Sequence, residues 1–155
     1  MAILNRILAS EAIDLDGFRL SLWSGFYTTP VFAVIERSYG LLRDENNLLF
    51  CLSHYGPLTA KSVSDVLGRP KNSISRAVES LLRRGLIRRE LIASDRRRAL
   101  LTLEPEGQEL IAETVDLFKT RQEEMLGCLS TVERVALDAI LAKLMVNAAS
   151  WLKAQ

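Results

Sequence analysis

The sequence predicts a mainly α-helical fold that carries one small β-hairpin. Apolar residues recur at steps of three and four along most of the 155-residue chain, which is helical spacing. Glycines and prolines divide the middle of the chain into short segments, and after Gly85 the spacing changes to that of two strands. A compact three-helix unit followed by a hairpin is the arrangement of a winged helix-turn-helix, here with further helices before and after it.

The N-terminal region, residues 1–40, is expected to hold helices. Apolar residues at helical spacing fill residues 3–13 and continue from Phe18 to Tyr27. The pair Thr28-Thr29 precedes Pro30, which suits a hydroxyl cap followed by proline at the first position of a new helix. We therefore expect a helix break at Pro30, and Gly40 is expected to end the second helix.

Three short helices are predicted between residues 44 and 85. Asp44 is the expected N-cap of the first, which stops at Gly56-Pro57. Thr59 caps the second and Gly68 closes it. The third begins at Pro70, ends at Gly85 and buries Ile74, Val78 and Leu81 on one face.

The hairpin and the C-terminal helices follow. Residues 86–92 and 98–103 are the predicted strands, with a polar tip at residues 93–97. A long helix is predicted from Pro105, and the Ser130/Glu133 capping box predicts the last one. The expected organisation is one compact chain, with N-terminal dimerisation helices in 1–40, the winged helix-turn-helix in 44–103 and C-terminal dimerisation helices in 105–155.

The charge distribution points to a polyanion. The net charge is only +1, but residues 69–98 hold ten basic and three acidic residues, while the rest of the chain holds ten basic and sixteen acidic ones. A charged run is often only solvated surface. Here the basic residues coincide with the predicted third helix and the hairpin, which favours a DNA footprint.

Two basic elements are the candidate DNA readers. On the helix from Pro70, Asn72, Arg76 and Glu79 fall opposite the apolar face, so this polar face can enter the major groove. At the hairpin tip, Asp95 is placed to brace Arg97 in a bidentate pair against the minor groove or phosphates. The predicted DNA contacts are Arg69, Lys71, Asn72, Ser73, Ser75, Arg76, Asp95, Arg96, Arg97 and Arg98.

Several other classes of protein are not expected. There is one histidine, no phosphate-binding glycine loop and no nucleophile with an evident base, so an enzyme is not predicted, and neither is a cofactor. Two cysteines without a CxxC or Cys/His cluster predict no metal site. No apolar stretch is long enough for a membrane span or a signal peptide, so a cytoplasmic protein is expected.

These motifs together resemble the MarR family of regulators. The resemblance rests on Gly56-Pro57-Leu58-Thr59, on the run from Leu67 to Arg76, on Gly85 to Arg89, on Asp95-Arg96-Arg97 and on Leu103 to Gly107. It implies a homodimer that binds a pseudo-palindromic operator and whose repression or activation is relieved by a small ligand or an oxidant. Glu104 stands where the family usually has Thr, and the expected break at Pro30 also departs from the family pattern.

Dimerisation and ligand binding are expected from the flanking helices. Their apolar side chains, such as Ile7, Leu110 and Trp151, exceed what a small winged domain can cover, which favours a twofold partner. The resemblance places a ligand pocket between these helices and the winged domain, which Tyr27, Phe32, Arg37 and Tyr39 are candidates to line. Aromatic residues at helical spacing are, however, more often part of a core or an interface than of a binding site.

Two further alternatives stay open from the sequence. Redox sensing requires an exposed thiol beside a cation. Cys51 lies in an apolar run, and Cys128 has no basic residue close to it in the sequence. The runner-up function is a winged-helix module that binds protein without contacting DNA. It predicts an apolar or acidic recognition face, against which Arg76 and the arginines at 96–98 argue.

Overall fold

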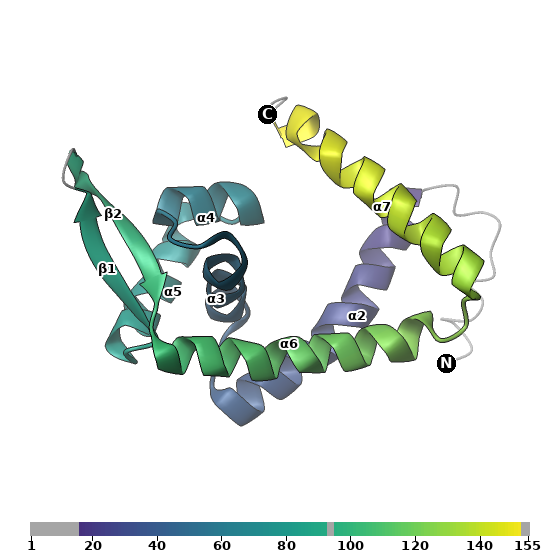
Figure 1. Cartoon of the computed structure of the whole chain (residues 1–155), viewed down its shortest axis with the longest axis horizontal. Helices are drawn as coiled ribbons and strands as arrows, with labels where there is room; N and C mark the ends of the chain where they lie inside the picture. The colour runs from purple at the N-terminus through teal and green to yellow at the C-terminus, as the bar shows by residue number, and fades with distance from the viewer. Residues whose placement is uncertain (1–15, 93–94, 153–155) are drawn as a thin grey trace. The chain divides into compact units, whose positions relative to one another are not determined.

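The computed structural model describes residues 16–92 and 95–152 and confirms the predicted fold class (Figure 1). The elements in chain order are α2 (Asp16–Tyr39), α3 (Arg43–Tyr55), α4 (Ala60–Leu67), α5 (Lys71–Arg83), β1 (Ile87–Ile92), β2 (Asp95–Leu103), α6 (Pro105–Leu126) and α7 (Thr131–Leu152). The helix predicted over residues 3–13 lies outside the described residues. Two compact units meet after Phe118.

Local signals set the ends of the three central helices. Thr59 Oγ1 accepts a hydrogen bond from the Ser62 N–H at 3.1 Å, which confirms Thr59 as the cap of α4. Gly68 ends α4 with a φ of +59°, a left-handed conformation that favours glycine. The predicted start of α5 at Pro70 is one residue early, because Pro70 is the N-cap and the helix begins at Lys71.

The predicted cap of α3 was wrong. The helix begins at Arg43, so Asp44 lies in its first turn rather than at its N-cap. Leu42 is the N-cap instead, and Glu45 at the third helical position satisfies it, because Glu45 Oε2 accepts a hydrogen bond from the Leu42 N–H at 2.8 Å. Asp44 is thereby left for a different partner.

One hydrophobic core joins the three helices to the hairpin and to α6. The predicted inward face of α5 is buried, with Ile74, Val78 and Leu81 each at most 1% exposed. The other fully buried large apolar side chains come from α3, α4, β2, α6, α2 and the loop before α3: Leu48, Leu49, Val63, Leu101, Ile111, Ile35 and Leu41. These contacts hold α5 rigidly by one side and leave its other side at the surface.

The hairpin is antiparallel and docks at its base against the helices. Ile87 pairs with Leu103 and Leu91 with Ala99, and the register shifts after Leu91. Leu58, between α3 and α4, exchanges two backbone hydrogen bonds with Leu101, at 3.2 and 2.8 Å. The second strand starts at Asp95 instead of Arg98, so three residues assigned to the tip continue the strand.

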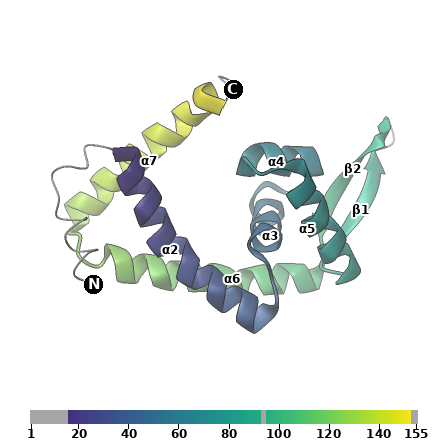
Figure 2. The ribbon, with the colours of Figure 1, turned by 180° about the vertical axis from the view of Figure 1, so that it is seen from behind.

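Helix α2 runs through Pro30 without a break, contrary to the predicted restart. Proline removes one backbone donor and costs a helix interior about 3 kcal/mol. Contacts on both sides of Pro30 offset that cost. Tyr27 before it and Phe32 after it both pack on Phe118 of α6, with 5.8 and 5.3 Å between ring centres, and Val31 and Ile35 are buried. Both views show α2 crossing α6 (Figure 2).

Gly107 explains why a glycine follows Pro105 and Glu106 at the start of α6. A Cβ atom at this position would overlap the backbone carbonyl oxygen of Leu86. The glycine therefore lets α6 pass directly against the chain as it enters β1, which fixes the helix beneath the hairpin.

The second unit, Lys119–Gln155, consists of the end of α6 and helix α7. The predicted capping box is confirmed, because Glu133 Oε2 accepts from the Ser130 N–H at 2.8 Å and Ser130 Oγ accepts from the Glu133 N–H at 3.4 Å. Arg134 pairs with Glu123 at 2.8 Å and links the two helices. Along the described helices, none is long and apolar enough to cross a membrane.

Candidate nucleic-acid interface

Helix α5 has one buried face and one polar face. Ile74, Ala77, Val78 and Leu81 are buried. The residues exposed at the surface are polar or charged: Lys71, Asn72, Ser75, Arg76, Glu79 and Arg83. Ser73 is half-buried at the edge between the two faces. The structure therefore places the predicted contacts of this helix together on its outer side.

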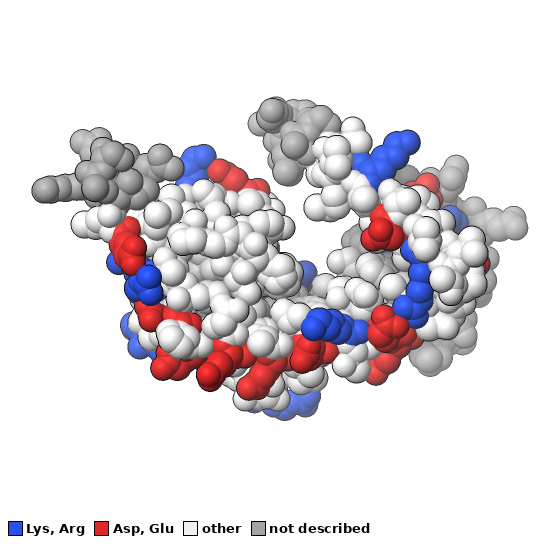
Figure 3. Space-filling model, viewed as in Figure 1, with Lys and Arg blue, Asp and Glu red and all other residues white. Residues whose placement is uncertain are grey.

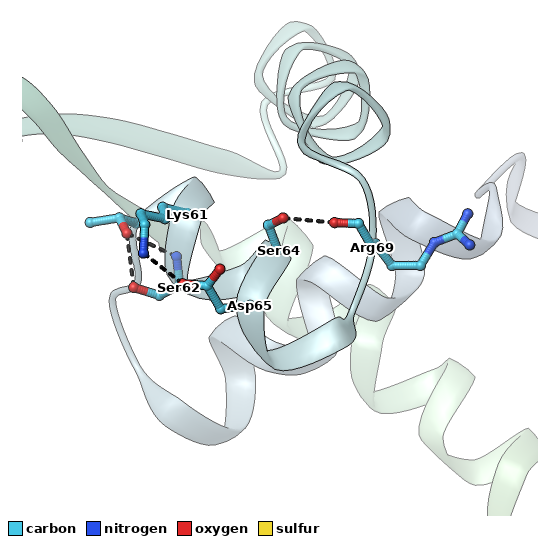
Figure 4. A network of polar contacts seen from close by, with 6 residues as sticks. Lys61, Ser62, Ser64, Asp65 and Arg69 are labelled. Carbon is cyan, nitrogen blue, oxygen red and sulfur yellow. Dashed lines mark hydrogen bonds and ion pairs between the residues drawn. The ribbon is translucent and has the colours of Figure 1, made fainter. Parts of the chain in front are cut away.

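The turn before α5 is held by its own hydrogen bonds (Figure 4). Ser64 Oγ donates to the Arg69 carbonyl oxygen at 2.7 Å, and the Arg69 N–H donates to the Ser64 carbonyl oxygen at 3.2 Å. The Arg69 side chain leaves the turn away from Ser64. The start of α5 is thus fixed to α4, which is what a helix presented to a ligand requires.

Arg69 makes a bidentate ion pair that the sequence did not predict. Its Nε and Nη2 atoms donate to the two carboxylate oxygens of Asp44 at 2.9 and 3.1 Å. The hydrogen bonds and the charge of Asp44 raise the pKa of the guanidinium. Arg69 was predicted as a DNA contact, and the structure shows that its charge is already matched by a carboxylate from α3.

A cavity of about 570 Å³ lies beside α5. It is bounded by the start of α3, the turn before α5 and one flank of α5 itself. Its lining residues are Leu42, Arg43, Asp44, Glu45, Arg69, Ser73, Arg76, Ala77, Glu79, Ser80 and Arg83. Of the predicted DNA contacts, Arg69, Ser73 and Arg76 meet here.

Two other arginines of the basic segment stabilise the fold. Arg84 donates to the carbonyl oxygens of Tyr39 and Gly40 at 3.0 and 3.1 Å, so the end of α5 holds the end of α2. Arg88 pairs with Glu90 at 2.6 Å and with Glu104 at 3.3 Å, and the hydrogen bonds to these carboxylates raise its pKa. Glu104, the departure from the family pattern, therefore has a partner on β1.

Four other basic residues of this segment differ from Arg69, Arg84 and Arg88. Within the described part of residues 69–98, Lys71, Arg76, Arg83 and Arg89 are exposed and form no ion pair. Acidic side chains gather instead along α6 (Figure 3), where Glu106, Glu109, Glu113 and Asp116 are exposed. The net charge is close to zero because the acidic residues of α6 offset part of the positive charge of the basic segment.

The hairpin tip stays a prediction. The backbone of Asp95 to Arg98 belongs to β2, but the side chains of Asp95, Arg96, Arg97 and Arg98 lie outside the described residues. The proposed brace between Asp95 and Arg97 is therefore untested by the structure.

The four candidate pocket residues do not line the cavity beside α5. The Tyr27 hydroxyl donates to the Phe118 carbonyl oxygen at 3.4 Å, and the rings of both Tyr27 and Phe32 pack on the Phe118 ring. The Tyr39 hydroxyl donates to Glu113, which raises the pKa of Tyr39. Arg37 is exposed. The aromatic residues pack between α2 and α6, and a ligand pocket among them stays a prediction.

The cysteines differ in environment. Cys51 is buried in α3, and burial raises the pKa of its thiol, so it is poorly nucleophilic, as predicted. Cys128 is exposed. Across residues 16–92 and 95–152, no cluster of three or more His, Cys, Asp or Glu side chains is placed to hold a metal ion.

Comparison with known proteins shows which family the central part of the chain resembles. The family model described as MarR family matches residues 39–98. The transcriptional regulator HosA of Escherichia coli O157:H7 is 32% identical over 75 residues, which are 48% of this chain and 56% of HosA. The match thus spans just over half the length of this curated relative.

Solved structures share the fold over most of the chain. The Staphylococcus aureus MepR–DNA complex has a TM-score of 0.71 at 21% identity, covering 86% of this chain and 98% of MepR. Bordetella bronchiseptica BpsR, whose DNA binding is regulated by 6-hydroxynicotinic acid, has a TM-score of 0.71 at 24% identity, covering 85% and 94%. The chain is therefore similar to the MarR family over residues 39–98, and it shares the winged-helix fold of these solved structures over most of its length.

Proposed function

We propose that the protein is a sequence-specific DNA-binding transcriptional regulator that inserts α5 into the major groove. The observation that carries this proposal is the polar, basic face of α5, presented by a helix whose opposite face is fully packed. Rigid support matters because reading base edges requires side chains held in a defined position. The similarity to known proteins supports the same function, since HosA is a transcriptional regulator and MepR has been crystallised with DNA.

The dimensions of α5 suit this role. A helix with its side chains is about 10–12 Å across, and the major groove of B-DNA is about 12 Å wide. Asn72 and Arg76 on the outer face have the side-chain chemistry for adenine and guanine edges. Lys71, at the first position of the helix, is placed for a phosphate.

We propose that the hairpin is the second DNA-binding element. It leaves the core beside α5 and is anchored at its base through Leu58 and Leu101. Arg96, Arg97 and Arg98 lie at or near its tip, where a cationic loop would reach the minor groove or the adjacent phosphates.

We propose that the regulator acts as a homodimer. Helix α7 carries exposed apolar side chains along its length, among them Val132, Val135, Ile140, Met145 and Val146. Exposure of so much apolar surface is unfavourable in water, and a second copy of the chain would cover it. A twofold protein would match an operator with two related half-sites about 10 base pairs apart.

We propose that a small apolar or aromatic anion relieves repression. The support is the resemblance to the MarR family and the shared fold with BpsR, whose DNA binding is regulated by 6-hydroxynicotinic acid. Binding between α2 and α6 would change the spacing of the two α5 helices only if the ligand favours one arrangement over the other. A thermal-shift screen tests this, and failure of every aromatic acid to raise the melting temperature would count against it.

Selection of bound sequences from a random duplex pool tests the central proposal. The expected outcome is one palindromic motif, with half-sites about one helical turn apart. The affinity should fall steeply with salt concentration because phosphate contacts release counterions. Enrichment of no motif together with a flat salt response would support the alternative, a winged-helix module that binds protein.

A further inference from the structure

We propose that the cavity between α3 and α5 holds one strand of the sugar–phosphate backbone of bound DNA, with Arg43 and Arg83 as phosphate contacts. This inference rests on the proposed function. It adds two binding residues from outside the predicted set, one of them on a helix that precedes the helix-turn-helix pair α4–α5.

The position of the cavity follows the flank of α5. Ser73, Arg76, Ser80 and Arg83 line it at steps of three, four and three residues, which places them in one stripe along the helix. Because the width of α5 nearly equals that of the major groove, a phosphate backbone must run along each flank of an inserted helix. The cavity is the space available to that backbone on the α3 side.

The charges around the cavity favour an anion once internal pairs are counted. Asp44 is neutralised by Arg69 at 2.9 Å. Glu45 is 4% exposed, accepts from the Leu42 N–H and lies 4.0 Å from Arg84. Those two carboxylates are therefore matched. The charged lining residues without an ion-pair partner among the described residues are Arg43, Arg76, Arg83 and Glu79, which give three positive charges and one negative charge.

Arg43 is held in place by an aromatic ring. Its guanidinium carbon lies 4.8 Å from the centre of the Phe32 ring, a cation–π contact. Phe32 is itself packed against Phe118. A guanidinium held against a fixed ring loses less conformational freedom when it binds a phosphate.

Arg83 lies two helical turns beyond Arg76, which is about 10 Å along the axis of α5. Both residues belong to the stripe that lines the cavity, so a strand that runs along this flank would pass Arg83 after it passes Arg76. Arg83 would therefore contact a phosphate beyond the base pairs that Arg76 can reach.

The test compares Arg43→Gln, Arg83→Gln and the double variant in the full chain. Binding to the selected operator duplex and to a scrambled duplex is measured by fluorescence anisotropy over a salt series. Each single variant should lose affinity about threefold to tenfold on both duplexes, because phosphate contacts carry no sequence information. Each should also make the slope of log K against log salt less steep by about 0.9 per contact in each subunit.

Three further variants make the test decisive. Arg19→Gln removes the same charge from the surface of α2, far along the chain from the cavity, and should leave both affinity and slope unchanged. Arg43→Lys and Arg83→Lys keep the charge and should keep the slope, which separates loss of a contact from loss of folding. Glu79→Gln should tighten binding to both duplexes, because it removes the lining carboxylate that has no ion-pair partner among the described residues.

The outcomes separate this inference from the function on which it rests. If the parent protein binds duplex DNA while Arg43→Gln and Arg83→Gln keep its affinity and salt slope, the cavity does not hold the backbone. Weaker binding restricted to the operator would show base reading instead and would also overturn the inference. If the parent binds no duplex at all, the proposed function fails together with it.

Discussion

Helices α5 and α7 both present long faces to solvent, but the chemistry of those faces is opposite. The apolar side chains of α5 are buried against α3, α4 and the hairpin, and its exposed side chains are polar or basic. In α7 it is the apolar side chains that are exposed, including Val146 at 81% and Met145 at 72%. The apolar face of α5 is satisfied within one chain, whereas that of α7 is not.

The difference fits the roles proposed for the two helices, DNA binding for α5 and dimerisation for α7. A helix that reads DNA must be fixed before DNA arrives, so its support has to come from the same chain. A helix that joins two copies has to keep its apolar surface available until the partner binds. The first region should therefore respond to mutation through folding, and the second through association.

Truncation of the α5 core should have the largest effect. Leu81 is fully buried, and Leu81→Ala should lower the free energy of unfolding by about 2–5 kcal/mol because it removes apolar contacts and leaves a cavity. Urea denaturation followed by circular dichroism measures this. Leu91→Ala is the matched control, since Leu91 on β1 is 67% exposed and should change stability by no more than about 0.5 kcal/mol.

A charge on α7 should act on association. Ile140 is 57% exposed, and Ile140→Asp should weaken the proposed dimer at least about tenfold, which is about 1.4 kcal/mol, because the carboxylate would be buried at the interface. Sedimentation velocity over a concentration series measures the dissociation constant. A wild-type chain that stays monomeric at every concentration, or a variant that dimerises as well as its parent, would contradict this use of α7.

Removal of the Arg84 contacts should have a smaller effect on stability. Arg84→Gln removes two charge-assisted hydrogen bonds, one to the carbonyl oxygen of Tyr39 at the end of α2 and one to that of Gly40. The free energy of unfolding should therefore fall by about 1–2 kcal/mol. Thermal and urea denaturation provide the measurement. The neighbouring exposed Arg83 is the control, and Arg83→Gln should leave folding stability nearly unchanged while it weakens DNA binding.

The smallest expected effect is a pH dependence at the start of α7. Hydrogen bonds from the Ser130 hydroxyl and backbone lower the pKa of Glu133 below its ordinary value of 4.5. Because the pKa is lower in the folded state, the ionised carboxylate stabilises the folded protein at pH values above 4.5. This stabilisation is lost as the pH falls from 4.5 through the lowered pKa. The acid sensitivity of unfolding below about pH 4.5 should therefore be reduced in Glu133→Gln, as measured by thermal denaturation from pH 6 to pH 3.

The features that the sequence determined by itself are those written in neighbouring residues. Thr59, Gly68 and Pro70 set the ends of α4 and the start of α5 because caps, left-handed turns and proline act within one turn of backbone. The stripe of Ile74, Val78 and Leu81 determined which face of α5 is buried. The apolar stripe also determined that the polar face opposite it is exposed, and this face holds most of the candidate interface.

Only the tertiary structure decided which of the described basic side chains lack an ion-pair partner and which of the predicted helix ends form. Asp44 and Arg69 are 25 residues apart, and Arg84 reaches carbonyl groups 44 and 45 residues away, so no local pattern could reveal either contact. Pro30 predicted a break that packing on both sides overrides. The physical reason is the same in each case: capping and periodicity depend on adjacent backbone, whereas ion pairing and burial depend on which distant segments the fold brings together.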